Sequence, residues 1–151
     1  MEGPLPWPRV AVLAGIKLLP QDVAALVCGL PGLQQLSAFA KGEWASLELP
    51  VGAESISVTC LNLWWASSSF GAAAHLPRLF RALERLEWVG GCDEVLESDF
   101  PGGLSCLTHL ELKTDRFSNY LANRRLMMRA RTVWQRIRML HRLRELTVRS
   151  P

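Results

Sequence analysis

Leucines recur in this chain at a spacing that changes from three to two within a single short stretch. The clearest copy is LSCLTHLEL (104–112), in which Leu104, Leu107, Leu110 and Leu112 are separated by three, three and two residues. An α-helix repeats its side-chain direction about every 3.6 residues and a strand about every 2, so neither element alone explains this spacing. The pattern indicates a turn that leads into a short strand, with the apolar side chains all on one side.

The same frame recurs along the chain, which predicts a repeat protein. Aligned on the second leucine slot, the copies have anchors near positions 7, 33, 58, 83, 107 and 143, at intervals of 26, 25, 25, 24 and 36 residues. One strand with its return is too small to bury its own apolar edge, so we expect the units to stack with their strands in a parallel sheet. The residues expected side by side in this sheet are Val10, Leu36, Leu61, Leu86, Leu110 and Leu146.

The pattern resembles the leucine-rich repeat family, whose unit carries L-x-x-L-x-L-x-x-N/C-x-L over roughly 20 to 29 residues. Pro31 in LPGLQQL and Pro77 in LPRL resemble the Leu-Pro pair that often precedes the strand in that family. The resemblance covers nearly the whole chain and implies one α/β domain, 1–151. This domain would be a short solenoid of about six repeats, with a parallel sheet on its concave face and helices and irregular returns on its convex face. The chain departs from the family where Asn or Cys is expected, since those positions hold Gly15, Lys41, Ala66, Gly91 and Asp115.

The returns between the predicted strands differ in character. Residues 20–30 (PQDVAALVCGL) are predicted to be helical, because Gln21 or Asp22 lies near the start and Gly29 near the end. Residues 73–83 are predicted to hold a turn or helix, and the return at 40–57 to be irregular or extended. A repeat begins almost at the N-terminus and a predicted strand ends just before Pro151, so we expect a fragment or a chain without full caps.

Positive charge is concentrated in the last part of the chain. The net charge is +3, yet from Arg116 onward there are ten arginines, no lysines and one acid. The segment 117–143 is predicted to be one long amphipathic helix, with an apolar face that Met127 and Trp134 widen. Its apolar face comprises Leu126, Ala130, Val133, Ile137 and Leu140. The predicted basic residues on its flanks are Arg124, Arg125, Arg129, Arg131, Arg138 and Arg142.

Two interpretations of this segment remain open. The apolar face can dock on the repeats, leaving the arginines as solvated edges. Alternatively, the segment can engage an acidic protein groove, nucleic acid or an anionic membrane.

Side chains between the anchored leucines should point away from the core, in rows across the concave face. One row contains Leu13, Phe39, Trp64 and Val89 in succession, and an apolar stripe with polar neighbours is typical of a protein-binding surface. The alternative is that these residues tuck under the following loops and widen the core. The predicted partner-binding residues are Phe39, Asn62, Trp64, Arg85, Glu87, Val89, His109, Glu111 and Lys113.

The sequence contains no recognisable catalytic or cofactor-binding constellation. His75, His109 and His141 have no Cys, Asp or Glu at metal-ligand spacing, and the four cysteines form no CxxC pair. No GxGxxG, GxxxxGK or GxSxG frame is present. We therefore predict a protein that is not an enzyme, with no cofactor, no metal site and no small-molecule substrate.

The sequence predicts a non-enzymatic scaffold that binds a protein partner, of unknown identity, through the concave face. The alternatives are an Arg-rich helical module that binds nucleic acid or anionic membrane, or the substrate-receptor part of an F-box-like ubiquitin ligase adaptor. The N-terminus lacks a basic region typical of a signal peptide, and no apolar run approaches the ~18–20 residues of a membrane span. We expect a cytoplasmic location, with the nucleus, or the cytoskeleton or ciliary axoneme by family analogy, as alternatives.

Overall fold

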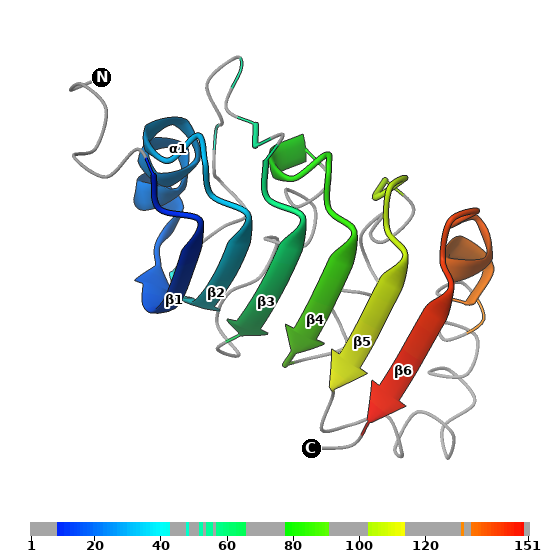
Figure 1. Cartoon of the computed structure of the whole chain (residues 1–151). Coiled ribbons are helices and arrows are strands. Elements are labelled where there is room, and N and C mark those ends of the chain that lie inside the picture. The colour runs from blue at the N-terminus through cyan, green and yellow to red at the C-terminus, as the bar shows by residue number, and fades with distance from the viewer. Residues whose placement is uncertain are drawn as a thin grey trace.

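A six-stranded parallel sheet dominates the computed structural model of the chain (Figure 1). The strands lie side by side in the order β1-β2-β3-β4-β5-β6, so each strand neighbours the one that precedes it in the sequence. The fold is therefore mixed α/β with an open sheet. The structure describes residues 9–42, 48, 52, 54–55, 57–65, 78–90, 103–113, 131 and 134–149. The elements are β1 (Val12–Leu18), α1 (Pro20–Gly29), β2 (Gln35–Ala40), β3 (Cys60–Trp65), β4 (Arg85–Val89), β5 (His109–Lys113) and β6 (Glu145–Arg149).

A tight turn before β2, β4, β5 and β6 explains the three-residue leucine spacing. Leu107 N–H donates to the Leu104 carbonyl at 3.1 Å, and residues 105–106 form the turn between them. The same bond joins Leu33 to Leu30 and Leu143 to Leu140, each at 3.1 Å. The strand that follows gives the two-residue spacing, so one unit contains both periods, as predicted.

Strands β2 to β6 are aligned without a break in register. Leu36, Leu61, Leu86, Leu110 and Leu146 occupy neighbouring positions on successive strands, which confirms the prediction for these five residues. A shared carbonyl joins each strand to the next at the point where the strands begin. For example, the Gln34 carbonyl accepts both Thr59 N–H at 3.0 Å and Cys60 N–H at 3.1 Å. The other carbonyls that accept two N–H groups in this way are those of Ala11, Thr59, Glu84 and Thr108.

The predicted position of the first unit is wrong by three residues. Leu13, and not Val10, pairs with Leu36, and Val12 pairs with Gln35. Because side chains alternate along a strand, an odd shift moves each residue to the opposite face. Val12, expected in the core, is accordingly 58% exposed.

A break in the β1 register accounts for the remaining difference at this edge. The pairing shifts between Leu13 and Ile16, and Gly15 lies there with φ of 72°, a conformation that favours glycine. Beyond this irregularity Lys17 pairs with Phe39. Lys17 therefore takes the outward position that is expected for Leu13 from the sequence.

Leucines from every strand form one continuous core on a single face of the sheet. Trp88 of β4 is the largest fully buried side chain, at 0% exposure. Helix α1 covers the β1–β2 end of this face, because Val23 and Val27 belong to the same core cluster. The helix confirms the prediction for 20–30 almost completely. It starts at Pro20, which suits the first helical position since its missing N–H has no partner there.

The last return differs from the predicted helix 117–143. Within its described part, residues 134–138 are helical, but residue 139 begins a turn and 141–142 form the turn that enters β6. The predicted end of the helix at 143 is therefore wrong, since the strand needs that turn. Ile137 and Leu140 are 6% and 5% exposed and join the core, whereas Trp134 is 40% exposed and lies outside the buried face.

The predicted basic residues of this return fall into two groups. Arg124, Arg125 and Arg129 lie outside the described residues. Arg131 and Arg138 are exposed at helical positions, and Arg142 is exposed in the turn and not on a helix. No helix in the described part of the chain is both long and apolar enough to cross a membrane.

The returns at 73–83 and 40–57 agree with the predictions as far as the structure describes them. Residues 78–79 are helical and 81–82 form a turn, while 73–77 lie outside the described residues. Ser55 and Phe80 form an isolated parallel bridge, and Arg81 Nε lies 2.6 Å from Glu54 Oε2. The returns that precede β3 and β4 therefore stack on each other, as the strands do. None of the described residues between 41 and 57 is helical.

Candidate functional site

The face of β2–β6 that points away from the core carries every residue predicted to bind a partner. We call this surface the open face. Its outward residues form three rows across neighbouring strands, each with the predicted membership from β2 to β6. The rows are Gln35, Cys60, Arg85, His109 and Glu145; Ser37, Asn62, Glu87, Glu111 and Thr147; and Phe39, Trp64, Val89, Lys113 and Arg149.

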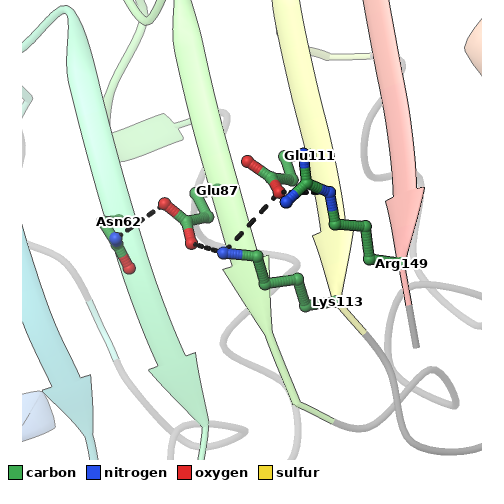
Figure 2. A network of polar contacts seen from close by, with 5 residues as sticks. All are labelled: Asn62, Glu87, Glu111, Lys113 and Arg149. Carbon is green, nitrogen blue, oxygen red and sulfur yellow. Dashed lines mark hydrogen bonds and ion pairs between the residues drawn. The ribbon is translucent and has the colours of Figure 1, made fainter. Parts of the chain in front are cut away.

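Five of these side chains form a connected group that we call the ion network (Figure 2). Asn62 Nδ2 donates to Glu87 Oε2 at 2.8 Å, and Lys113 Nζ donates to Glu87 Oε1. Lys113 Nζ also lies 3.6 Å from Glu111 Oε1, which is 3.5 Å from Arg149 Nε. The network thus runs from β3 to β6, and acids alternate with hydrogen-bond donors along it.

The ion network holds its central lysine in the charged form. The hydrogen bond to Glu87 raises the pKa of Lys113 above its usual 10.5, and the nearby charges of Glu87 and Glu111 act in the same direction. Partial desolvation of Lys113 opposes this shift but does not cancel it. Lys113 is therefore protonated at physiological pH, where it holds the neighbouring carboxylates in place and does not suit the role of a general base.

Asn62 joins the ion network through its amide nitrogen. Glu87 accepts from that nitrogen, so the amide oxygen of Asn62 must point the other way. This oxygen is buried and has no hydrogen-bond partner among the described residues. The orientation of Asn62 is therefore set by the carboxylate of Glu87.

His109 forms a second, smaller polar contact on the first row. Its Nε2 lies 3.5 Å from Glu145 Oε2, and its Nδ1 lies 2.7 Å from the Thr108 hydroxyl. That hydroxyl donates to the Glu84 carbonyl at 3.0 Å, so it accepts from Nδ1–H of the imidazole. Attraction to Glu145 then requires a second proton on Nε2. The His109–Glu145 contact joins β5 to β6, and the Thr108 hydroxyl links the imidazole to the Glu84 carbonyl.

An aromatic patch, which we define as Phe39 and Trp64, occupies the third row beside the ion network. The two residues are register partners on β2 and β3, and they are 36% and 49% exposed. Both rings are therefore partly exposed to solvent. Val89, the next member of this row, is half-buried.

Two lysines flank the aromatic patch. Lys41 Nζ lies 5.5 Å from the centre of the Phe39 ring, within the range of a cation–π interaction. Lys17, on β1, is the register partner of Phe39 on its other side. These residues line a hollow of about 520 Å³ over the first three strands. Its lining consists of Gly15, Ile16, Lys17, Ser37, Ala38, Phe39, Lys41, Asn62 and Trp64.

A second hollow of about 400 Å³ crosses the first and second rows of the open face. Among its lining residues are Ser37, Asn62, Glu87, His109 and Thr147, which come from five successive strands. The open face is therefore a continuous surface lined mainly by polar residue types, and its exposed aromatic side chains lie at the β2–β3 end.

Sequence reasoning missed several residues of this region. Lys17 was missed because apolar spacing places the first unit in the wrong register, and Lys41 because the repeat pattern places it in a turn. Ser55 was missed because a serine stands where the other units have an apolar residue. Its side-chain oxygen accepts Val58 N–H at 3.1 Å, replacing the carbonyl that closes the other turns.

Comparisons with known proteins give no match, whether with family models, curated proteins or solved structures. Among the described residues, no cluster of three or more His, Cys, Asp or Glu side chains could hold a metal ion. Cys28, Cys60 and Cys106 are free thiols. The open face, with its aromatic patch and ion network, is therefore the best-defined candidate site within the described chain.

Proposed function

We propose that this chain is a leucine-rich-repeat-type solenoid and acts as a non-enzymatic scaffold that binds a protein partner on its open face. In this proposal the open face is the concave surface of the solenoid. The repeated unit of turn and strand, the aligned leucines and the stacked returns support the repeat assignment. These three features are expected when small units stack side by side and share one core.

The exposure of Trp64 next to Phe39 is the observation that carries the proposed function. An indole ring that is 49% exposed leaves a large apolar area in water, although burial of such area is favourable. Tryptophan is among the residues most enriched at the energetic centres of protein interfaces. A partner that covers both rings would gain this burial, since adjacent strands hold the rings side by side.

The ion network supports this function from its position beside the aromatic patch. Its side chains already hold one another in place, so a partner need not order them on binding. Pre-ordered polar groups reduce the entropy cost of association. The open face thus combines an apolar area at its β2–β3 end with pre-ordered polar groups beside it, and protein–protein interfaces likewise join apolar and polar areas.

The other candidate functions gain less support from the described residues. Ile137 and Leu140 of the Arg-rich return are buried in the core, which favours docking of this segment on the sheet. Binding of nucleic acid or anionic membrane by the arginines, and a role in an F-box-like adaptor, remain predictions. The cytoplasmic location remains a prediction as well.

Photo-cross-linking from the aromatic patch tests the proposed function. A photoreactive phenylalanine analogue at position 39 keeps an aromatic side chain there and should capture the partner in cells. The same analogue at Arg81, which pairs with Glu54 on the returns, is the matched control. We expect one cross-linked protein from position 39 that is absent from position 81. The captured protein should then be purified, and its affinity for the chain measured.

Substitution of Trp64 decides whether that capture reflects binding. Trp64→Ala should weaken the purified complex by about thirtyfold, since a central tryptophan contributes on the order of 2 kcal/mol or more. Met139→Ala removes another apolar side chain, 66% exposed but away from the open face, and should leave the affinity unchanged. Equal effects of the two substitutions would contradict the proposal. So would a complex whose affinity falls log-linearly with salt and survives Trp64→Ala, because that behaviour indicates nucleic acid on the arginines.

A further inference from the structure

Charge is distributed unequally over the sheet, between strands β1–β3 and strands β4–β6. The strands β4–β6 carry Arg85, Lys113 and Arg149 against Glu87, Glu111 and Glu145, so their formal charges sum to zero without His109. Strands β1–β3 carry no acidic residue at all, and the charged side chains beside the aromatic patch are Lys17 and Lys41. The half that exposes the aromatic rings is therefore also the half with excess positive charge.

Two of the three acids on the open face are already engaged by cations, and the third lies beside a histidine. Glu87 and Glu111 are held in the ion network, and Glu145 faces His109. In contrast, Lys17 has no ion-pair partner among the described residues and is exposed. Among the described residues that line the hollow over β1–β3, none carries a carboxylate. A partner that enters this hollow would meet the ammonium group of Lys17, which pairs with no acid among the described residues.

From this arrangement we infer that the hollow over β1–β3 binds a protein segment in which carboxylates flank a large apolar side chain. The inference rests on the proposed function and specifies the chemistry of the partner. The apolar side chain would lie against Phe39 and Trp64, whose strands are ~4.8 Å apart. The carboxylates would lie beside it and face Lys17 and Lys41. A basic segment would instead bring like charges together, which is unfavourable at an interface.

Geometry limits the length of such a segment. Lys17, Phe39 and Trp64 lie on three successive strands in one row, so the cation and the two rings are about one strand spacing apart. A carboxylate next to the apolar residue, or one or two positions away, reaches Lys17 while the apolar group covers the rings. Recognition therefore needs only a few residues, as expected of a short linear motif in an extended conformation.

Selection from a random peptide library tests the inference directly, because it does not require the natural partner to be identified. Phage-displayed random peptides are selected on the purified full chain and, in parallel, on Trp64→Ala. The wild-type chain should enrich peptides with Asp or Glu within about two residues of an aromatic or large aliphatic side chain, and Trp64→Ala should lose this enrichment. The enriched consensus is then synthesised, and its affinity is measured by fluorescence anisotropy.

Charge reversal identifies the lysines that bind the peptide. Lys17→Glu combined with Lys41→Glu should weaken binding of the acidic consensus peptide by about tenfold or more, because two attractive contacts become repulsive. The matched control is Arg138→Glu with Arg142→Glu, which changes the net charge equally at exposed positions of the last return. This control should change the affinity by less than about threefold, the part due to long-range electrostatics.

Several results would overturn the inference. These are a consensus without acids, no enrichment over Trp64→Ala, or equal effects of the two charge-reversal variants. The proposed function is judged separately by the cross-link at position 39. A captured partner whose bound segment is neutral or basic would refute the acidic chemistry and leave the scaffold function intact. Absence of both the cross-link and the enrichment would refute both.

Discussion

The aromatic patch and the ion network occupy the same face of the same sheet. They differ in how far their side chains are paired with other side chains of this chain. Every charged member of the ion network contacts another side chain of this chain, across strands β3 to β6. The aromatic patch touches a lysine but leaves much of both rings in water. The charges of the ion network are thus paired within the molecule, whereas the rings of the aromatic patch are only partly covered. For this reason we propose the aromatic patch, and not the ion network, as the main contact with a partner.

The largest expected effect on stability comes from comparing two tryptophans that lie on neighbouring strands and on opposite faces of the sheet. Trp88 is fully buried, so Trp88→Ala should destabilise the fold by about 3–5 kcal/mol. Trp64→Ala should cost about 1 kcal/mol or less, because the ring is half exposed. Urea denaturation followed by circular dichroism measures both. Comparable losses would show that Trp64 serves the core, and the contrast between patch and network would then fail.

The next effect concerns the support beneath the aromatic patch. Ser55 closes the turn that enters β3, the strand that carries Trp64. Ser55→Ala leaves Val58 N–H buried without an acceptor and should cost about 2 kcal/mol in unfolding free energy. Ser57→Ala is the control. Its hydroxyl has only a 3.3 Å contact with Ser55, so a cost within about 0.5 kcal/mol is expected. If both alanines cost the same, the Ser55 bond does not hold this turn.

A smaller effect on stability tests how much the ion network contributes to the fold. Glu87→Gln removes the charge that Lys113 and Asn62 share and should cost about 1 kcal/mol. Glu145→Gln, at a side chain that is 64% exposed, should change stability by less than about 0.5 kcal/mol. Thermal and urea unfolding of the two variants give the comparison. A neutral Glu87→Gln would mean that the network contributes specificity but no stability.

The smallest effect appears only in alkaline solution. The pKa of Lys113 is raised in the folded chain above 10.5, its usual value in the unfolded chain. A raised lysine pKa contributes stability that is fully present below the unfolded value and is lost as the pH rises through the folded value. The stability difference between the wild type and Lys113→Met should therefore be constant from neutral pH to about pH 10 and shrink above 10.5. A difference that shrinks between neutral pH and pH 10 would point to another group.

Much of the sheet could be predicted from the spacing of apolar residues alone. The L-x-x-L turn and the alternation after it have different periods, and their junction fixes which residue starts each strand. For β2 to β6 this junction gave the correct register, and with it the outward rows that contain Trp64 and Glu87. The first unit failed for a physical reason. Trp7, Val10 and Val12 match the spacing, but β1 contains an irregularity at Gly15 that apolar spacing does not reveal.

The contacts within the candidate site were less predictable than its membership. Asn62, Glu87, Glu111 and Lys113 were expected on one face, but which carboxylate accepts from which donor depends on side-chain rotamers. The last helix was predicted too long because the apolar period continues through Leu140, although that residue already belongs to the turn before β6. Periodicity assigns a residue to a face. It does not show where a helix gives way to a turn that shares the same leucine.

The shared carbonyls at the start of each strand have a consequence for how the molecule comes apart. Each of these oxygens accepts two amides at the start of the following strand. Each strand is therefore hydrogen-bonded only to its nearest neighbours in the sheet. Local unfolding then proceeds inward from the outermost strands, and a substitution that destabilises one strand weakens mainly the strands beside it. The amides of β3 and β4, farthest from both edges, should be the last to exchange with solvent deuterium.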